Sequence, residues 1–291
     1  MKTIKNEKLA LTVQLDGGAI WSLVDLEDGE ELMFDGDASI WDKHDAVLFP
    51  FVGRQKDGYY EYNGVRYDVP IHGLAPYQKY EVKKQSESSI TLGFSSNSET
   101  LKIYPFTFDF SITYTLEGKT LSVKYTIKNK GEQTMYYYVG SHPALKIDGA
   151  EQNADDTSGN YLDFCTENNS TYTLCNNFIM PPENIEGCVE MKKDVFVKYP
   201  SLVLDRKNTT TVLRRKSGKQ VKIISSSPII CVWSDDKRGA FVAVECWWGL
   251  PDYWIDTKRE LKTKNFINSL QPQKECEYEY KLEFINKQEI R

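Results

Sequence analysis

The chain contains only three histidines in 291 residues, and two of them lie in short, unusual contexts. One stands in Ile71-His72-Gly73 and the other in Ser141-His142-Pro143. Histidine is the side chain whose ordinary pKa allows it to give and accept protons near neutral pH. We therefore treat His72 and His142 as candidates for proton transfer or for binding a polar ligand.

A third candidate is Glu245, which ends the apolar run Phe241-Val242-Ala243-Val244 and leads into Cys246-Trp247-Trp248. In a strand its side chain would share a face with those of Phe241 and Ala243 and would be partly buried beside large rings. Burial raises the pKa of a carboxyl group toward the range useful to a general base. The alternative is a glutamate at the edge of a sheet, solvated or paired with a lysine.

Arg54 follows Gly53 at the end of an apolar run, where a strand should give way to a loop. Side chains at strand ends are well placed to bind a ligand, because a rigid scaffold positions them. His142 has a similar advantage, since the residue before a proline favours extended backbone. Structural roles stay open for all three: a surface ion pair for Arg54, a turn for His72 and a backbone hydrogen bond in the core for His142.

Other kinds of active site are not indicated. His44 stands among charges in Asp42-Lys43-His44-Asp45 and is expected at the solvated surface. The sequence has neither an H-x-H nor an H-E-x-x-H spacing, so no metal site is predicted. A G-x-S-x-G nucleophile elbow is also missing from the sequence.

The elements that must position the candidates are strands, because apolar and polar side chains alternate with period 2 through most of the chain. Residues 107–115 and 121–129, joined by Glu117-Gly118-Lys119, predict a hairpin with one buried face. No stretch of ordinary helix length shows an apolar stripe with helical spacing. The pattern therefore predicts a single all-β domain over residues 1–291, a large antiparallel β-sandwich. Further strands are expected at 9–14, 20–26, 90–94, 134–139, 202–204, 211–214, 221–225, 229–233, 241–245 and 277–284.

Composition argues against several classes of partner. The net charge is −6, whereas a nucleic-acid-binding protein needs a basic face to neutralise phosphates. The charged N-terminus does not resemble a signal peptide, and no run of about 18 apolar residues could span a membrane. The six cysteines contain no C-x-x-C pair and are expected to be reduced packing residues. These features predict a cytoplasmic protein with neither a nucleic-acid nor a membrane partner.

Several short motifs are spread over nearly the whole chain. They are Pro50-Phe51-Val52-Gly53-Arg54 with Asp57-Gly58, His72-Gly73, Ser141-His142-Pro143, Val232-Trp233-Ser234, Glu245 with Pro251-Asp252, and Leu270-Gln271-Pro272. Together, and in this order, they resemble the motifs of the aldose 1-epimerase (galactose mutarotase-like) family, and more closely its LacX-like bacterial branch. The fold of that family is a large antiparallel β supersandwich, which agrees with the strand pattern.

The resemblance implies an isomerase that interconverts the α and β anomers of a free hexose by opening the ring at C1. Glu245 would take the proton of the C1 hydroxyl, and His142 would protonate the ring oxygen. The implied sugar-binding residues are His72, Arg54, Trp233 and Asp252. No cofactor is implied, because the two catalytic groups end each turnover in their starting forms. The expected partner is a sugar, and the oligomeric state to consider is a homodimer.

Two departures from the family bear on the choice of sugar. Leu74-Ala75-Pro76 follows His72-Gly73, where members of the branch often have phenylalanine, alanine and arginine. Cys246-Trp247-Trp248 follows Glu245, where well-studied mutarotases have threonine and glutamine. A hexose-6-phosphate mutarotase stays open as an alternative, with Arg54 and Arg66 as candidate phosphate ligands. A sugar-binding or sensor protein without turnover also stays open.

Overall fold

The structure is a computed structural model that describes residues 1–149, 157–175, 178–179, 183–198, 200–205, 209–235, 240–252 and 258–286. The alternating segments form strands, as the sequence predicts. β9 (Phe108–Glu117) and β10 (Thr120–Asn129) make the expected hairpin, with Leu116 opposite Leu121 and every second side chain buried. The prediction of an all-β, antiparallel fold is therefore confirmed in the described residues.

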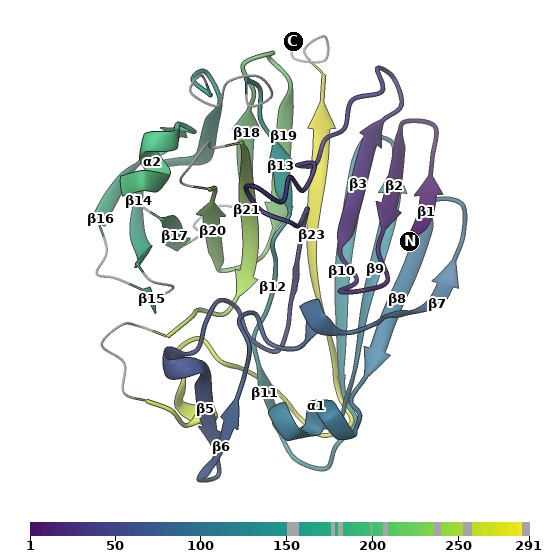
Figure 1. Cartoon of the computed structure of the whole chain (residues 1–291), viewed down its shortest axis with the longest axis vertical. Coiled ribbons are helices and arrows are strands. Elements are labelled where there is room, and N and C mark those ends of the chain that lie inside the picture. Colours follow the sequence, from purple (N-terminus) through teal and green to yellow (C-terminus); the bar gives the residue numbers. More distant parts are fainter. Residues whose placement is uncertain are drawn as a thin grey trace.

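Most strands belong to one 16-stranded antiparallel sheet that runs through the molecule (Figure 1). Near one end of its strand order lies β21 (Phe241–Trp248), whose eight residues are all buried because both of its faces are covered. In spatial order the sheet contains β4 (Val47–Leu48), β12 (Val139–Ser141), β21, β20 (Ile229–Trp233), β17 (Ser201–Asp205), β14 (Tyr161–Cys175), β18 (Thr210–Arg214), β19 (Gln220–Ser225), β23 (Glu275–Ile285), β10, β9, β8 (Ser89–Ser95) and β7 (Glu81–Gln85).

Shorter elements complete the described fold. β13 (Ala144–Lys146) pairs with β21, whereas β15 (Phe178–Ile179) and β16 (Glu183–Glu190) pair with β14. Two small sheets pair β5 (Tyr59–Tyr62) with β6 (Val65–Asp68) and β11 (Met135–Tyr137) with β22 (Asn268–Leu270). The helices are α1 (Ser98–Ile103), α2 (Lys193–Lys198) and the single turns η1 (Lys56–Gly58), η2 (Ala75–Tyr77) and η3 (Leu261–Thr263).

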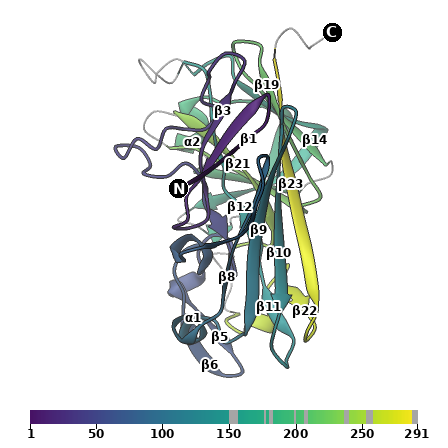
Figure 2. The ribbon, with the colours of Figure 1, turned by 90° about the vertical axis from the view of Figure 1, so that its right-hand side faces the viewer.

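A three-stranded sheet lies over one end of the large sheet and makes a second layer (Figures 1 and 2). It consists of β1 (Lys2–Lys5), β2 (Leu9–Val13) and β3 (Ile20–Asp25). The layers are joined by apolar packing and by polar contacts such as that of the Tyr114 hydroxyl on β9, which donates to the carbonyl oxygen of Gly18 at 2.7 Å. Buried aromatic residues such as Tyr80 and Tyr114 thus contribute to the packing between the sheets.

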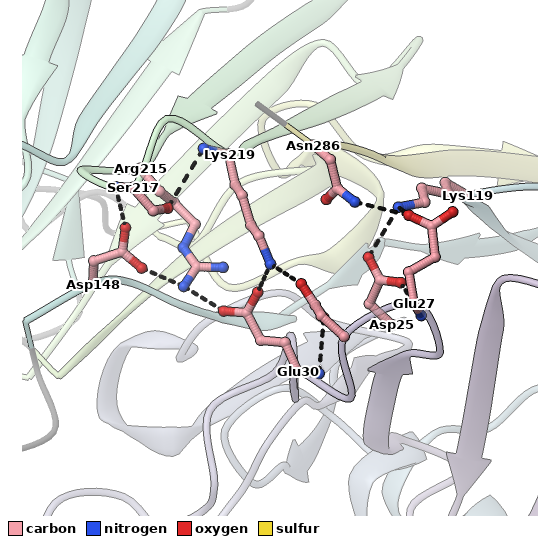
Figure 3. Close-up of polar contacts among 10 residues, drawn as sticks. Asp25, Glu27, Glu30, Lys119, Asp148, Arg215, Ser217, Lys219 and Asn286 are labelled. Carbon is pink, nitrogen blue, oxygen red and sulfur yellow. Dashed lines mark hydrogen bonds and ion pairs between the residues drawn. The ribbon is translucent and has the colours of Figure 1, made fainter. Parts of the chain in front are cut away.

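Ion pairs connect the two layers along one shared edge, here called the rim (Figure 3). The turn after β3 brings Glu30 within 2.6 Å of Arg215, which follows β18, and Asp28 within 2.5 Å of Lys219. Asp25 at the end of β3 pairs with Lys119 of the β9–β10 turn at 3.1 Å. Because Arg215 and Asp25 are buried, their partners satisfy charges that would otherwise be costly in the interior.

Two further findings concern the described residues as a whole. None of the helices within them is long and apolar enough to cross a membrane. The five cysteines whose side chains are described carry free thiols; Cys231 and Cys246 are buried, whereas Cys165 and Cys188 are exposed, in contrast to the packing role expected of all of them.

Candidate active site

The centre of the site is a row of side chains across neighbouring strands of the large sheet. Gly140 on β12 lies opposite Trp247, and Ala144 on β13 lies opposite Ala243. Counting inward from both pairs places His142 opposite Glu245, because the register continues across the short interruption between β12 and β13. On the other side of β21, Cys231 of β20 lies opposite Glu245. Sheet pairing therefore fixes the relative positions of these three side chains.

His142 and Glu245 are in contact. Nε2 of the histidine lies 3.5 Å from Oε1 of the glutamate, and both side chains are almost completely buried. The other carboxyl oxygen, Oε2, accepts a hydrogen bond of 3.0 Å from the indole Nε1–H of Trp247, which is on the same face of β21. Each oxygen of Glu245 thus has its own partner, and Oε1 is held toward the imidazole.

Burial shifts the two pKa values in opposite directions. Desolvation raises the pKa of Glu245 well above its ordinary value, against the smaller effects of hydrogen bonds from Trp247 and Cys231. Desolvation also lowers the pKa of His142 to about 4, and the nearby charge of Lys43 acts in the same direction. Without a ligand, Glu245 is therefore protonated and the imidazole of His142 is neutral, so both groups are uncharged. The one proton that the two groups can exchange is then on Glu245.

His72 reaches the same region from a separate loop. Its ring centroid lies 5.6 Å from that of His142, nearly perpendicular to it. The ring accepts a hydrogen bond at Nδ1 from the backbone N–H of Gly53 at 3.1 Å. Burial keeps the pKa of His72 well below its usual range, and repulsion from Arg54 and from the protonated form of His142 acts in the same direction. The neutral ring therefore carries its proton on Nε2, where it can donate to a ligand.

Backbone conformation explains why a glycine follows His72. His72 and Gly73 both have positive φ, of 63° and 79°. A Cβ atom added to Gly73 would lie 2.6 Å from the carbonyl oxygen of Phe49 and 2.7 Å from Cδ of Pro50. Only glycine fits this position without movement of the neighbouring backbone. The strained conformation of His72 is held by this close packing.

We expect Gly73→Ala to destabilise the protein by about 2–5 kcal/mol, from the left-handed conformation and the clash with backbone together. Gly64→Ala is the matched control, because Gly64 also has positive φ, at 77°, but has nothing within 4 Å of an added Cβ. The control should lose only about 1–2 kcal/mol. Urea unfolding measures both, and equal losses would show that the contact with Phe49 is unimportant.

A cavity of about 280 Å³ joins these side chains and opens to solvent. Its volume is close to the lower end of the range for small-molecule sites, about 300–1,000 Å³. Of the residues expected from the sequence to form the site, His72, His142, Trp233 and Glu245 line it. Among the described residues, no group of three histidines, cysteines or carboxylates is placed to hold a metal ion.

Arg54 and Asp252 do not line this cavity. Arg54 is exposed, although its charge adds to the lowering of the pKa of His72 that burial causes. Asp252 is buried and pairs with the buried Lys264 at 2.6 Å, and it also accepts the backbone N–H of Lys56 at 3.0 Å. Asp252 therefore makes contacts within the protein, whereas its motif predicted a contact with the sugar.

His44 corrects a second expectation. It is buried, with 8% of its surface exposed, and its ring centroid lies 4.1 Å from that of Trp21. Burial lowers its pKa. The prediction of a solvated residue was wrong because Trp21, Phe34 and Gly36 enclose the imidazole, and the local charge pattern contains no sign of these contacts. Lys43 is exposed and His44 points inward, whatever the charge of their neighbours.

Several residues of the cavity were not anticipated from the sequence. Trp41 forms an aromatic wall, with its ring centroid 5.0 Å from that of His142 and 5.3 Å from that of Trp233. Lys43 lies on the same loop, and Tyr77 and Cys231 also line the cavity. The only sequence signal for Trp41 was a large aromatic residue in a polar segment. Tyr77 follows the Leu74-Ala75-Pro76 departure closely and could have been flagged for that reason.

The fold and cavity define an all-β protein with a buried carboxyl–imidazole pair in a pocket of small-molecule size. Residues 1–279 match the model of the aldose 1-epimerase family. The chain therefore belongs to the aldose 1-epimerase family, a family of isomerases, and the resemblance found in its motifs is confirmed.

Relatives agree with this assignment. The chromosomal LacX protein of Lactococcus lactis subsp. lactis is 26% identical over 266 residues, which cover 85% of this chain and 87% of LacX. A galactose mutarotase related enzyme from Lactobacillus acidophilus is 27% identical with a TM-score of 0.90, covering 98% of this chain and 97% of that one. A galactose mutarotase-like protein from Lactobacillus casei is 25% identical with a TM-score of 0.88, covering 98% and 100%. The galactose mutarotase-like fold is thus established.

Proposed function

We propose that the protein is a mutarotase, which interconverts the α and β anomers of a hexose without a cofactor. The observation that carries the proposal is the buried pair of His142 and Glu245, 3.5 Å apart at the wall of a cavity of monosaccharide size. Anomer exchange needs one group to take a proton from the C1 hydroxyl and another to give a proton to the ring oxygen. Both oxygens are bonded to C1, so groups a few Å apart can serve them.

The burial of the pair suggests how its proton is used. Before the sugar reacts, the proton is on Glu245, and it passes to His142 when the sugar is bound. Glu245 then accepts the proton of the C1 hydroxyl while His142 protonates the ring oxygen, and the C1–O5 bond breaks. After rotation about C1–C2, both transfers reverse and close the ring on the other face of the aldehyde. One proton on the pair is therefore needed throughout.

The remaining polar and aromatic groups would hold the sugar. His72 can donate its Nε2–H to a hydroxyl, and Trp41 and Trp233 offer ring faces to the apolar face of a pyranose. Arg54, near the opening of the cavity, would stabilise negative charge that develops on the sugar. The galactose mutarotase related enzyme of Lactobacillus acidophilus and the galactose mutarotase-like protein of Lactobacillus casei support a sugar as the ligand.

A sugar phosphate is the second candidate substrate, because one cation lines the cavity. Lys43 is exposed there, and its charge influences both His72 and His142. Arg54 adds a second positive charge near His72. Two cations near one opening can bind a phosphate dianion, whereas a neutral hexose has no need of them.

The test is anomer exchange by saturation-transfer NMR on glucose, galactose and their 6-phosphates. Exchange above the spontaneous rate on any of them supports mutarotation, and the ratio of kcat/KM values between free and phosphorylated sugars identifies the substrate class. Binding of a sugar without faster exchange would overturn the proposal in favour of a sugar-binding or sensor protein.

The pH profile makes a separate prediction. Below its lowered pKa of about 4, His142 is protonated while Glu245 also carries its proton. Glu245 then has no neutral base to which it can pass that proton. We expect kcat/KM, corrected for spontaneous exchange, to stay level from pH 7 to about 5 and to fall tenfold per unit below about pH 4. Circular dichroism at each pH confirms that the protein is folded. An acid limb near 6.5, the ordinary pKa of histidine, would contradict the buried pair.

A further inference from the structure

The segment that enters β4 contains a buried carboxyl group with no place in the mechanism so far. Asp45 is 3% exposed. Its Oδ2 accepts the backbone N–H of Ile20, at the start of β3, at 3.0 Å. Its Oδ1 is buried and has no hydrogen-bond partner among the described residues. An isolated carboxylate in such surroundings is costly, so its presence needs an explanation.

Sheet register places this carboxyl group beside the catalytic pair. β4 pairs with β12 so that Val47 lies opposite Ser141 and Leu48 opposite Gly140. The same register sets Ala46 opposite His142, and Ala144 donates its N–H to the carbonyl oxygen of His44 at 3.0 Å. Ala46 lines the cavity, whereas the side chain of Asp45 points to the opposite side, into the core.

Asp45 also interacts with the pair itself. Burial raises the pKa of Asp45 to about 6, against the smaller effects of the backbone N–H groups of Ile20, Ala46 and His142. Among the described residues, only the N–H of Ile20 is within hydrogen-bond distance of the carboxylate. The charge of Asp45 in turn contributes to the raised pKa of Glu245. The other groups that face Glu245 are His142, the thiol of Cys231 and the indole of Trp247.

Tyrosines surround the rest of Asp45. Its charge raises the pKa values of Tyr80, Tyr114, Tyr125 and Tyr280, which come from the segment before β7 and from β9, β10 and β23. Burial is the main cause of each shift, so all four remain neutral. In these surroundings no cation among the described groups offsets the charge of Asp45, and its field extends to Glu245.

We infer that Asp45 is a positioning residue for proton transfer: its buried carboxylate lies beside the backbone of His142 and places a negative charge behind Glu245 that keeps the proton on the pair. The inference rests on the proposed function, since it concerns the same two groups. Asp45 touches no part of the cavity and acts only through them. Near neutral pH Asp45 is ionised, because its pKa is about 6, so the effect operates where the enzyme would work.

The first test is the pH profile of Asp45→Asn with the sugar that the wild-type protein converts best. Without the charge, Glu245 loses its proton at lower pH, so the alkaline limb of kcat/KM should move to lower pH and activity in that limb should fall severalfold. A purely structural role would lower stability and leave the limb in place. A profile that overlays that of the wild type would overturn the inference while leaving the proposed function intact.

Asp25→Asn is the matched control. Asp25 is also a buried aspartate, but it belongs to the ion pairs of the rim, where it binds Lys119 (Figure 3). This variant should lose stability without any shift of the alkaline limb. A shift equal to that of Asp45→Asn would show that loss of a buried carboxylate anywhere changes the profile, and would remove the case for Asp45.

A second measurement needs neither a variant nor a sugar. Carboxyl ¹³C NMR of the full-length wild-type protein should show Asp45 titrating at about pH 6, with an inflection at the same pH in the carboxyl signal of Glu245 or the imidazole signals of His142. If those signals do not respond, the inference fails. This result stands even if Asp45→Asn does not fold, or if the wild-type protein exchanges no sugar and the proposed function fails.

Discussion

Replacing Glu245 with glutamine is expected to lower kcat/KM for anomer exchange by about 10²- to 10⁴-fold, the usual contribution of a general acid or base. Glutamine has nearly the same shape and can still accept the hydrogen bond from Trp247, but it cannot take or give a proton. Saturation-transfer NMR measures the rate, with spontaneous exchange subtracted. A rate near that of the wild type would remove Glu245 from the mechanism.

The same variant should remain folded, which makes the result easy to interpret. The pKa of Glu245 is raised in the folded protein, so its ionisation favours unfolding as the pH rises above the unfolded value. Neutral glutamine removes this effect, and stability at pH 7 should be equal to or greater than that of the wild type. Glu277→Gln is the control for activity, because Glu277 lies on β23 with half of its side chain exposed and pairs with Lys124. It should convert sugar at the wild-type rate.

The second large effect is expected for His142→Ala, which should also lose about 10²- to 10⁴-fold in kcat/KM. The pair then lacks the group that receives the proton of Glu245, and the ring oxygen has no acid beside it. The space left beside Trp41 and Trp233, which both contact the ring of His142, should admit free imidazole. Added imidazole should therefore restore part of the rate, as measured by the same NMR experiment.

His44→Ala separates loss of chemistry from loss of packing. His44 is equally buried and also stacks on a tryptophan, but it lies outside the cavity. Its removal should lower the melting temperature and leave anomer exchange nearly unchanged. If both histidine variants lost activity in parallel with stability, the role of His142 would be structural.

The strands were predictable because a half-buried strand shows itself in period-2 alternation. β9, β10 and β20 agree closely with the expected ranges, and β21 extends the expected strand from Glu245 to Trp248. The long strand β14 was not predicted. Its sequence contains Glu167-Asn168-Asn169-Ser170, polar residues that are mostly depleted in strands. Pairing with β16, β17 and β18 determines its conformation, and a local pattern does not contain that information.

The site was predictable to the extent that its residues stand at strand ends or on a buried strand face. His142 and Glu245 were recognised in this way, and alternation correctly placed Glu245 on the face of Phe241 and Ala243. Trp41 and Lys43 lie in an irregular loop, so no periodicity marks them. Asp252 shows the converse: a motif identified the residue, but the partner that buries it, Lys264, could be found only from the three-dimensional contacts.

The row of side chains across the sheet also has a consequence for how the protein folds. Ala46 and His142, and likewise His142 and Cys231, are separated by about a third of the chain, whereas Cys231 and Glu245 lie on the consecutive strands β20 and β21. Contacts between such distant segments close large loops and tend to form slowly. No fragment that lacks one of these segments can contain the complete row. Recovery of catalysis during refolding would therefore report completion of the central sheet, later than signals from the local β9–β10 hairpin.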